Sequence, residues 1–86
     1  MKTAFLFQYK TAFGIYAEVH TIANGDNIIS YINKAQAPFR VQSRLISVTA
    51  YKTTKAADTA ADVINGELLQ AIRAQGLNPA EVLRNV

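Results

Sequence analysis

The side chains of this chain that can do acid–base chemistry centre on its single histidine. His20 follows Glu18 by two positions, so in a β-strand the imidazole and the carboxylate would share one face. Such a pair can exchange protons with a substrate, and Tyr16 or Arg44 could complete the site. A histidine on the polar face of a strand is more commonly a solvated or cross-strand residue, and we favour that interpretation.

Other potentially reactive groups lack the surroundings that their chemistry needs. Asp58 and Asp62 are one helical turn apart, but they suit the positive N-terminal end of a helix. No serine stands in a nucleophile-elbow pattern, and the glycines do not have the spacing of a phosphate loop. The chain has no cysteine, and one histidine cannot form a multi-histidine metal site. We therefore expect no enzyme activity, no metal ion, no cofactor and no small-molecule ligand.

The composition predicts one small domain that spans residues 1–86. Apolar residues make up 50% of the chain and charged residues 17%, which is typical of a globular protein. The apolar run after Met1 breaks at Gln8 without a signal-peptide cleavage pattern. No segment approaches the roughly eighteen apolar residues of a membrane span. We expect a cytoplasmic protein without membrane contact, of bacterial or phage type from its compactness and lack of cysteine.

The net charge of +3 is unevenly distributed along the chain. From Asp58 onwards, two arginines stand against four acids, so this part is net negative. The positive charge therefore belongs to the predicted third strand and its flanks, where cations follow one another without an acid between Asp26 and Asp58. These cations are Lys34, Arg40, Arg44, Lys52 and Lys55.

Two runs near the start of the chain alternate with the period of two that indicates β-strands. In residues 2–9 three aromatic side chains share one face, and in residues 14–21 Ile15, Ala17 and Val19 do the same. The link between the runs is short and contains a glycine, which favours an antiparallel hairpin. We assign the aromatic row and the Ile15 row to one common core face.

A helix and a third strand follow the hairpin. The turn cluster "ANGDN" precedes a helix that ends before Pro38, and Asp26 can cap its N-terminus. The segment "RVQSRLISVTAYK" (residues 40–52) alternates as a strand, but its apolar residues change sides in the middle. Such a reversal needs one extra residue, so we predict a bulge near Leu45-Ile46 that directs both strand halves, including Ile46, towards one core.

The last third of the chain has the apolar period of a helix. We predict Thr54 as the N-cap and an alanine-rich stripe that continues through Gly66 to a C-terminal signal at Gly76. Beyond it, Asn78 and Glu81 have capping-box spacing, with a proline at the first helical position. This arrangement starts a short terminal helix.

These elements predict an α+β domain with the order β-β-α-β-α-α. Its three-stranded, mostly antiparallel sheet would have helices packed on one face. The opposite face would be mixed, with cations beside aromatic and polar side chains. The candidate partner-binding residues on that face are Arg40, Arg44, Tyr16, Lys10, His20 and Gln42.

Association with another protein explains such a mixed face best. We expect a non-catalytic interaction module that acts as a homodimer, an adaptor or an inhibitor of a larger complex, with Arg40, Arg44 and Tyr16 as contacts. The alternative is a nucleic-acid-binding module, in which Lys10 and Lys52 join the arginines on phosphates and Tyr16 stacks on a base. Salt separates the two, because phosphate contacts weaken steeply as salt rises.

Overall fold

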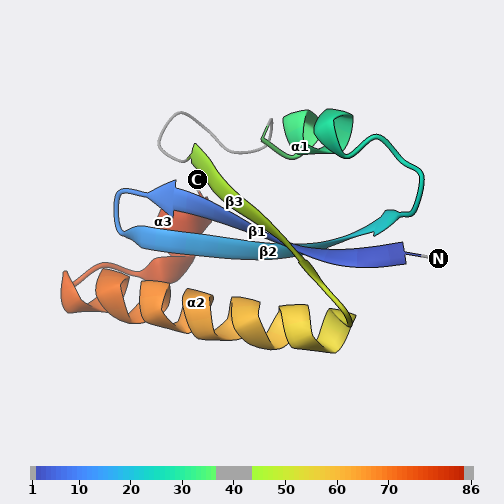
Figure 1. Cartoon of the computed structure of the whole chain (residues 1–86). Helices are drawn as coiled ribbons and strands as arrows, with labels where there is room; N and C mark the ends of the chain where they lie inside the picture. Colours follow the sequence, from blue (N-terminus) through green and yellow to red (C-terminus); the bar gives the residue numbers. More distant parts are fainter. Residues whose placement is uncertain (1, 37–43, 85–86) are drawn as a thin grey trace.

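The predicted order of elements is confirmed by the computed structural model, which describes residues 2–36 and 44–84. The described residues form an α+β fold in which three strands and three helices follow one another in the order β-β-α-β-α-α (Figure 1). The elements are β1 (Lys2–Thr11), β2 (Gly14–Ala23), α1 (Ile28–Gln36), β3 (Arg44–Tyr51), α2 (Thr54–Ala74) and α3 (Pro79–Arg84). Within the described residues, no helix has the length and apolar character needed to cross a membrane.

The strands form one antiparallel sheet in the order β2-β1-β3, with β1 in the centre. The sequence of β1 is apolar on both faces, as a central strand between two layers requires. Leu6 points to one side, and Phe7 and Tyr9 point to the other, and all three side chains are buried. The hydrophobic core therefore consists of two clusters, one on each face of the sheet.

The hairpin between β1 and β2 closes with a two-residue turn. Thr11 pairs with Gly14, and the Thr11 hydroxyl donates to the Gly14 carbonyl at 2.8 Å while it accepts the Phe13 N–H at 3.1 Å. A two-residue turn pairs odd positions with even ones, so Phe7 lies opposite Glu18. The aromatic row of β1 therefore shares its face with the polar row of β2. We predicted that the aromatic row of β1 shares a face with the row of Ile15, and this was wrong. That arrangement requires a loop one residue longer or shorter.

The predicted bulge in β3 is confirmed at the expected position. Gln8 pairs with Ser47 whereas Tyr9 pairs with Leu45, so Ile46 is the extra residue. The bulge lets Leu45 and Val48 pack against the same cluster around Tyr9. Ile46 itself is 46% exposed, so its predicted inward position was wrong. The extra residue of a bulge has no cross-strand partner, and here its side chain turns to solvent.

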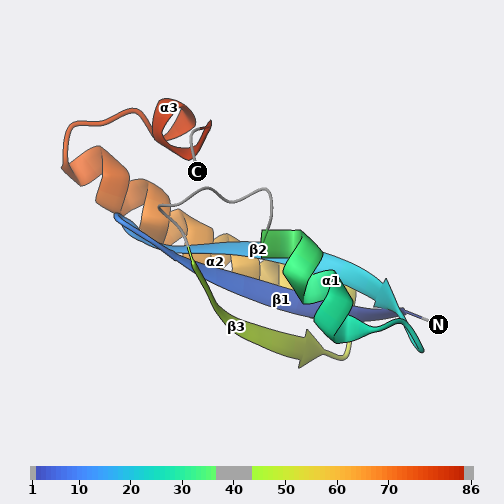
Figure 2. The ribbon, with the colours of Figure 1, turned by 90° about the horizontal axis from the view of Figure 1, so that it is seen from above.

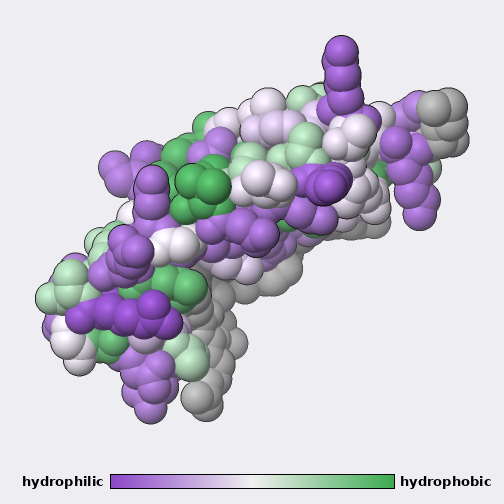
Figure 3. Space-filling view, turned by 90° about the horizontal axis from the view of Figure 1, so that it is seen from below, coloured by the Kyte–Doolittle hydropathy of each residue, from purple (hydrophilic) through white to green (hydrophobic). Residues whose placement is uncertain are grey.

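Helix α2 covers the face of the sheet that carries Leu6. Its buried stripe includes Ala57, Ala61 and Leu68, and the small alanines allow the helix backbone to come close to the strands. The helix continues through Gly66, as predicted. Seen from the α2 side, the surface is mainly hydrophilic, with small and separate hydrophobic areas (Figure 3).

The helix ends follow the capping chemistry that their sequences suggest, with two shifts of one residue. The N-cap of α2 is Thr53, which accepts the Ala56 N–H at 3.1 Å, and not Thr54. The N-terminus of α1 is capped by Asn27, which accepts the Ile29 N–H at 3.0 Å, and not by Asp26. Gly76 adopts the left-handed conformation predicted after α2 (φ 76°), and Asn78 caps α3 by accepting the Ala80 N–H at 3.0 Å.

Helix α1 lies on the opposite face of the sheet from α2 (Figures 1 and 2). Its residues Ile28, Tyr31 and Ile32 pack against the cluster around Phe7 and Tyr9. The sheet thus contacts helices on both faces, which differs from the one-sided packing that we expected. The register of the hairpin is the physical reason, because it directs the large aromatic row of β1 away from α2 and leaves it to be covered by another element.

Candidate functional site

The structure brings together only some of the predicted site residues. Lys10 and Arg44 are cross-strand partners, both exposed, on the sheet face that α2 also contacts. Tyr16 and His20 lie on the other face, where β2 pairs with the aromatic row of β1. The predicted single face with cations beside rings is therefore divided between two faces. The remaining two candidates, Arg40 and Gln42, lie outside the described residues.

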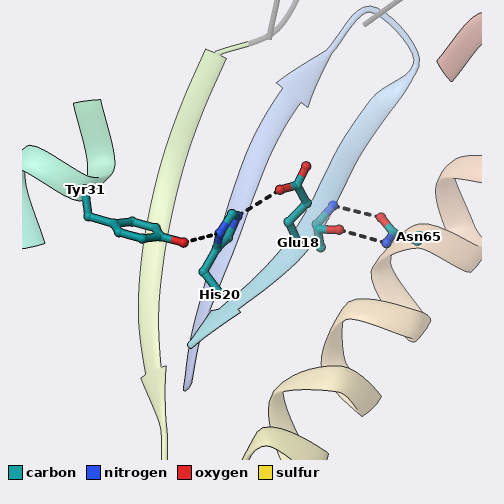
Figure 4. Close-up of polar contacts among 5 residues, drawn as sticks. Glu18, His20, Tyr31 and Asn65 are labelled. Carbon is teal, nitrogen blue, oxygen red and sulfur yellow. Dashed lines mark hydrogen bonds and ion pairs between the residues drawn. The ribbon is translucent and has the colours of Figure 1, made fainter. Parts of the chain in front are cut away.

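A chain of hydrogen bonds joins Glu18, His20 and Tyr31 beneath α1 (Figure 4). The Nε2 atom of His20 lies 2.8 Å from Glu18 Oε1, and its Nδ1 atom lies 2.7 Å from the Tyr31 hydroxyl. An ionised Glu18 can only accept, so Nε2 carries a proton and, in a neutral ring, Nδ1 accepts the Tyr31 proton. The imidazole also packs on the Phe7 ring at a centroid distance of 4.6 Å. These hydrogen bonds thus link α1 to β2.

Two further tyrosines on this face are held neutral by their surroundings. Burial raises the pKa of Tyr9 to about 12, and the negative charge of Glu18 adds to this effect. Burial also raises the pKa of Tyr16, with smaller contributions from the charge of Glu18 and a hydrogen bond to it. Both phenols therefore stay protonated to a higher pH than an exposed tyrosine does.

The order carboxylate, imidazole and hydroxyl is also that of a catalytic triad. A small cleft of about 200 Å³ is lined by Asp26, Asn27, Ser30 and Tyr31. Neither His20 nor Glu18 lines it, so a molecule in this cleft would not reach the imidazole. Within the described part of the chain, no three potential metal ligands come together either. The hydrogen bonds of His20 to Tyr31 and Glu18 attach α1 to the sheet.

A larger cleft of about 440 Å³ lies between the hairpin and α2. Its lining is mainly aliphatic, with Ile15, Ile64 and Leu68 as the main surfaces and Gln8 and Glu67 as the polar groups. No cluster of charged side chains converges on it that would select a particular ligand.

One position on the outer edge of β2, Ala17, is paired with a side chain of α2. The amide of Asn65 accepts the Ala17 N–H at 2.8 Å and donates to the Ala17 carbonyl at 2.9 Å (Figure 4). It thereby replaces the two hydrogen bonds that a neighbouring strand would make at this position. Sequence reasoning missed this role. The available signal was an asparagine beside the apolar stripe in the middle of a helix, a position where asparagine is unfavourable without a partner.

The outer edge of β3 has no such cover among the described residues. Because the backbone groups of Ala17 point away from β1, those of its partner Gln8 point towards β3 and pair with Ser47. By alternation, the N–H and C=O groups of Val48 and Ala50 point outwards. Within residues 2–36 and 44–84, no hydrogen bond from outside β1 reaches these backbone groups. Figure 2 shows β3 at the border of the sheet with no labelled element beyond it.

Exposed cations stand at both ends of this open edge. Arg44 begins β3 beside Lys10, and Lys52 follows the last residue of β3, close in sequence to Lys55 in the first turn of α2. None of these four side chains forms an ion pair within the described part of the chain, where the pair between Glu18 and His20 is found instead. The open edge is therefore positively charged at its two ends and uncharged between them.

Comparison with models of known protein families, with curated proteins and with solved structures gives no match to this chain.

Proposed function

We propose that this chain is a non-catalytic protein-binding module that accepts an extended strand of a partner at the outer edge of β3. The observation that supports this proposal is the difference between the two sheet edges. Helix α2 packs along β2, where Asn65 pairs with both outward backbone groups of Ala17, whereas the outward backbone groups of Val48 and Ala50 have no partner among the described residues. An unpaired edge is a template for strand addition, because its backbone groups provide affinity for any extended chain.

The side chains of β3 fit this role. Ile46 is 46% exposed, so it offers apolar area that a partner can cover. Thr49 and Ala50 are also exposed, and neither is large enough to block an approaching strand. The module could serve as an adaptor or as an inhibitor of a larger complex, or pair with a second copy of itself. We place it in the cytoplasm, because the chain lacks the cysteines of small disulfide-bonded extracellular domains.

Nucleic-acid binding is less well supported. Tyr16 lies on the opposite sheet face from Lys10 and Arg44. A nucleic-acid strand could not stack a base on Tyr16 and place its phosphates on this pair of cations from the same side. The geometry thus favours the protein-binding interpretation.

Backbone amide shifts of the ¹⁵N-labelled chain, titrated with a neutral peptide, test the proposal. The probe is an acetylated and amidated octapeptide, Gln-Thr-Val-Thr-Val-Thr-Val-Gln. We expect shifts at Val48 and Ala50 at millimolar peptide, since a single short strand binds weakly. Shifts confined to β2, or no shifts at all, would contradict the proposal.

A matched pair of variants distinguishes edge pairing from non-specific binding. Ala50→Pro removes one outward N–H group and should abolish the shifts, because proline cannot donate to an added strand. Ala50→Ser keeps the N–H group and should bind like the parent chain. Equal binding by the two variants would show that the peptide does not use this edge.

A further inference from the structure

We infer, building on the proposed function, that the strand accepted by β3 carries acidic residues at both of its ends. The open edge lies between two groups of exposed cations. Arg44 and Lys10 form one group at the start of β3, and Lys52 and Lys55 form the other after its end. The partner is therefore an extended acidic segment of another protein, recognised by backbone pairing along the strand and by charge at its ends.

The spacing of the two groups suits a single short segment. β3 has 8 residues, and at about 3.3 Å per residue its ends are roughly 25 Å apart. An added strand of about eight residues reaches from one group to the other. Its terminal carboxylates would then lie within reach of Arg44 and Lys52, whose long side chains can bend towards them.

The charges at the start of β3 also indicate an anionic ligand. Lys10 and Arg44 are directly opposite each other on neighbouring strands, an arrangement in which like charges repel. No acid of the described residues pairs with either of them. In sequence the nearest acid to the other group is Asp58, which is exposed one turn after Lys55 without an ion pair between them. A carboxylate from a partner would relieve the repulsion.

The same charges disfavour a second copy of this chain that pairs about Val48. Antiparallel pairing of two β3 strands centred on Val48 aligns position 44 with position 52 of the other copy, because the two numbers add to twice 48. Arg44 would then face Lys52 at both ends of the new ladder. An acidic strand has the complementary pattern, and we therefore choose it over the homodimer.

Three peptides of equal length test the inference. Their binding to the full chain is measured by amide shifts of the protein and by fluorescence anisotropy. The acidic probe replaces the terminal glutamines of the neutral octapeptide by glutamates, and a basic probe has lysines there. At about 50 mM salt we expect the acidic peptide to bind about tenfold more tightly than the neutral one and the basic peptide more weakly. At about 200 mM salt the advantage of the acidic peptide should shrink, because these charges are exposed to solvent.

Charge-removing variants show whether the named cations cause the preference. Arg44→Gln and Lys52→Gln should each reduce the advantage of the acidic peptide by about twofold to threefold. Arg73→Gln, which removes an exposed cation from the last turn of α2, should leave it unchanged. An unchanged preference in both Arg44→Gln and Lys52→Gln would overturn the inference.

The outcomes separate the inference from the proposed function. Equal binding of the three peptides, with shifts at Val48 and Ala50, overturns the acidic preference and leaves strand addition intact. The absence of shifts at β3 with every peptide overturns both. A monomer-to-dimer transition in sedimentation velocity that is lost in Ala50→Pro would identify a second copy as the occupant and overturn the choice of an acidic partner. Shifts at β3 caused by single-stranded DNA, but not by the acidic peptide, would likewise overturn it.

Discussion

The two edge strands of the sheet flank the same central strand, yet their outer edges differ. On β2, the amide of Asn65 satisfies both outward backbone groups of Ala17, so at this one position a helix side chain takes the place of a fourth strand. On β3, the outward groups of Val48 and Ala50 have no partner among the described residues. Helix α2 thus covers part of the β2 edge, and the β3 edge, which has no such cover among the described residues, is the more accessible to an added strand.

The position of α2 explains why only one edge is closed. The helix packs mainly along β2 and β1, where Ala57 and Ala61 allow a close approach, and this brings Asn65 level with the β2 backbone. β3 lies on the far side of β1 and receives little of this cover. The difference between the edges is therefore a consequence of where one helix crosses a three-stranded sheet.

Proline substitutions at the two edges should give the largest difference. We expect Ala17→Pro to lower the free energy of unfolding by about 3 to 4 kcal/mol, because it removes a hydrogen bond to Asn65 at a position that is only 2% exposed. Ala50→Pro should cost less than about 1 kcal/mol, since its N–H group points to solvent. Urea unfolding of both variants measures the difference, and equal costs would contradict the difference between the paired Ala17 and the unpaired Ala50.

Removal of the amide that closes β2 should have the next largest effect. Asn65→Leu leaves the N–H and C=O groups of Ala17 without partners, and we expect a loss of about 2 to 3 kcal/mol in unfolding free energy. The variant should also self-associate more strongly, because Ala17 then offers two unpaired backbone groups at the β2 edge. Gln70→Leu, at an exposed position of the same helix, is the control and should change stability by less than about 0.5 kcal/mol.

High pH should lower the free energy of unfolding through Tyr9, which lies in the central strand between the two edge strands. Tyr9 pairs with Tyr16 on one side and Leu45 on the other, and its pKa is raised to about 12 in the folded state. Between pH 10 and 12 the unfolded chain releases this proton while the folded chain keeps it, so the free energy of unfolding should fall by about 2 kcal/mol. The contribution of Tyr9 to the free energy of unfolding is thus fully present below pH 10 and is lost as the pH rises towards 12. Denaturant unfolding as a function of pH should show the fall, and Tyr9→Phe should reduce it to the smaller contribution of Tyr16.

Loss of the hydrogen bond between Tyr31 and His20 should lower the free energy of unfolding moderately, without a change at either sheet edge. Tyr31→Phe removes the hydrogen bond to His20 and should cost about 1 kcal/mol in unfolding free energy. Amide shifts should change around α1 and His20, while the response of Val48 and Ala50 to the neutral peptide should stay the same. A loss of peptide binding in this variant would mean that α1, and not the strand edge alone, controls binding.

The smallest effect on stability is expected at the bulge. Ile46→Thr changes a side chain that is 46% exposed, so the unfolding free energy should change by less than about 0.5 kcal/mol. Peptide affinity should fall by about twofold to fivefold, because the partner loses apolar area to cover. A large loss of stability without a change in affinity would place Ile46 in the core instead of the binding edge.

Local features of this chain were predictable from its sequence because they depend on a few neighbouring residues. The order of the elements, the bulge between Leu45 and Ser47, the left-handed Gly76 and the Asn78 cap all follow from short-range periodicity and backbone chemistry. The caps of α1 and α2 were misplaced by one residue, because adjacent residues of similar capping ability compete at each position.

Relations between distant segments were decided by the tertiary structure. The link between β1 and β2 is compatible with turns of different length, and only the observed pairing of Thr11 with Gly14 determines which rows of the two strands share a face. That choice separated Tyr16 and His20 from Lys10 and Arg44, and it placed α1 opposite α2. The sequence determined which residues alternate within each element; three-dimensional packing determined which rows meet and, through Asn65, which sheet edge stays open, because these depend on contacts between residues far apart in the chain.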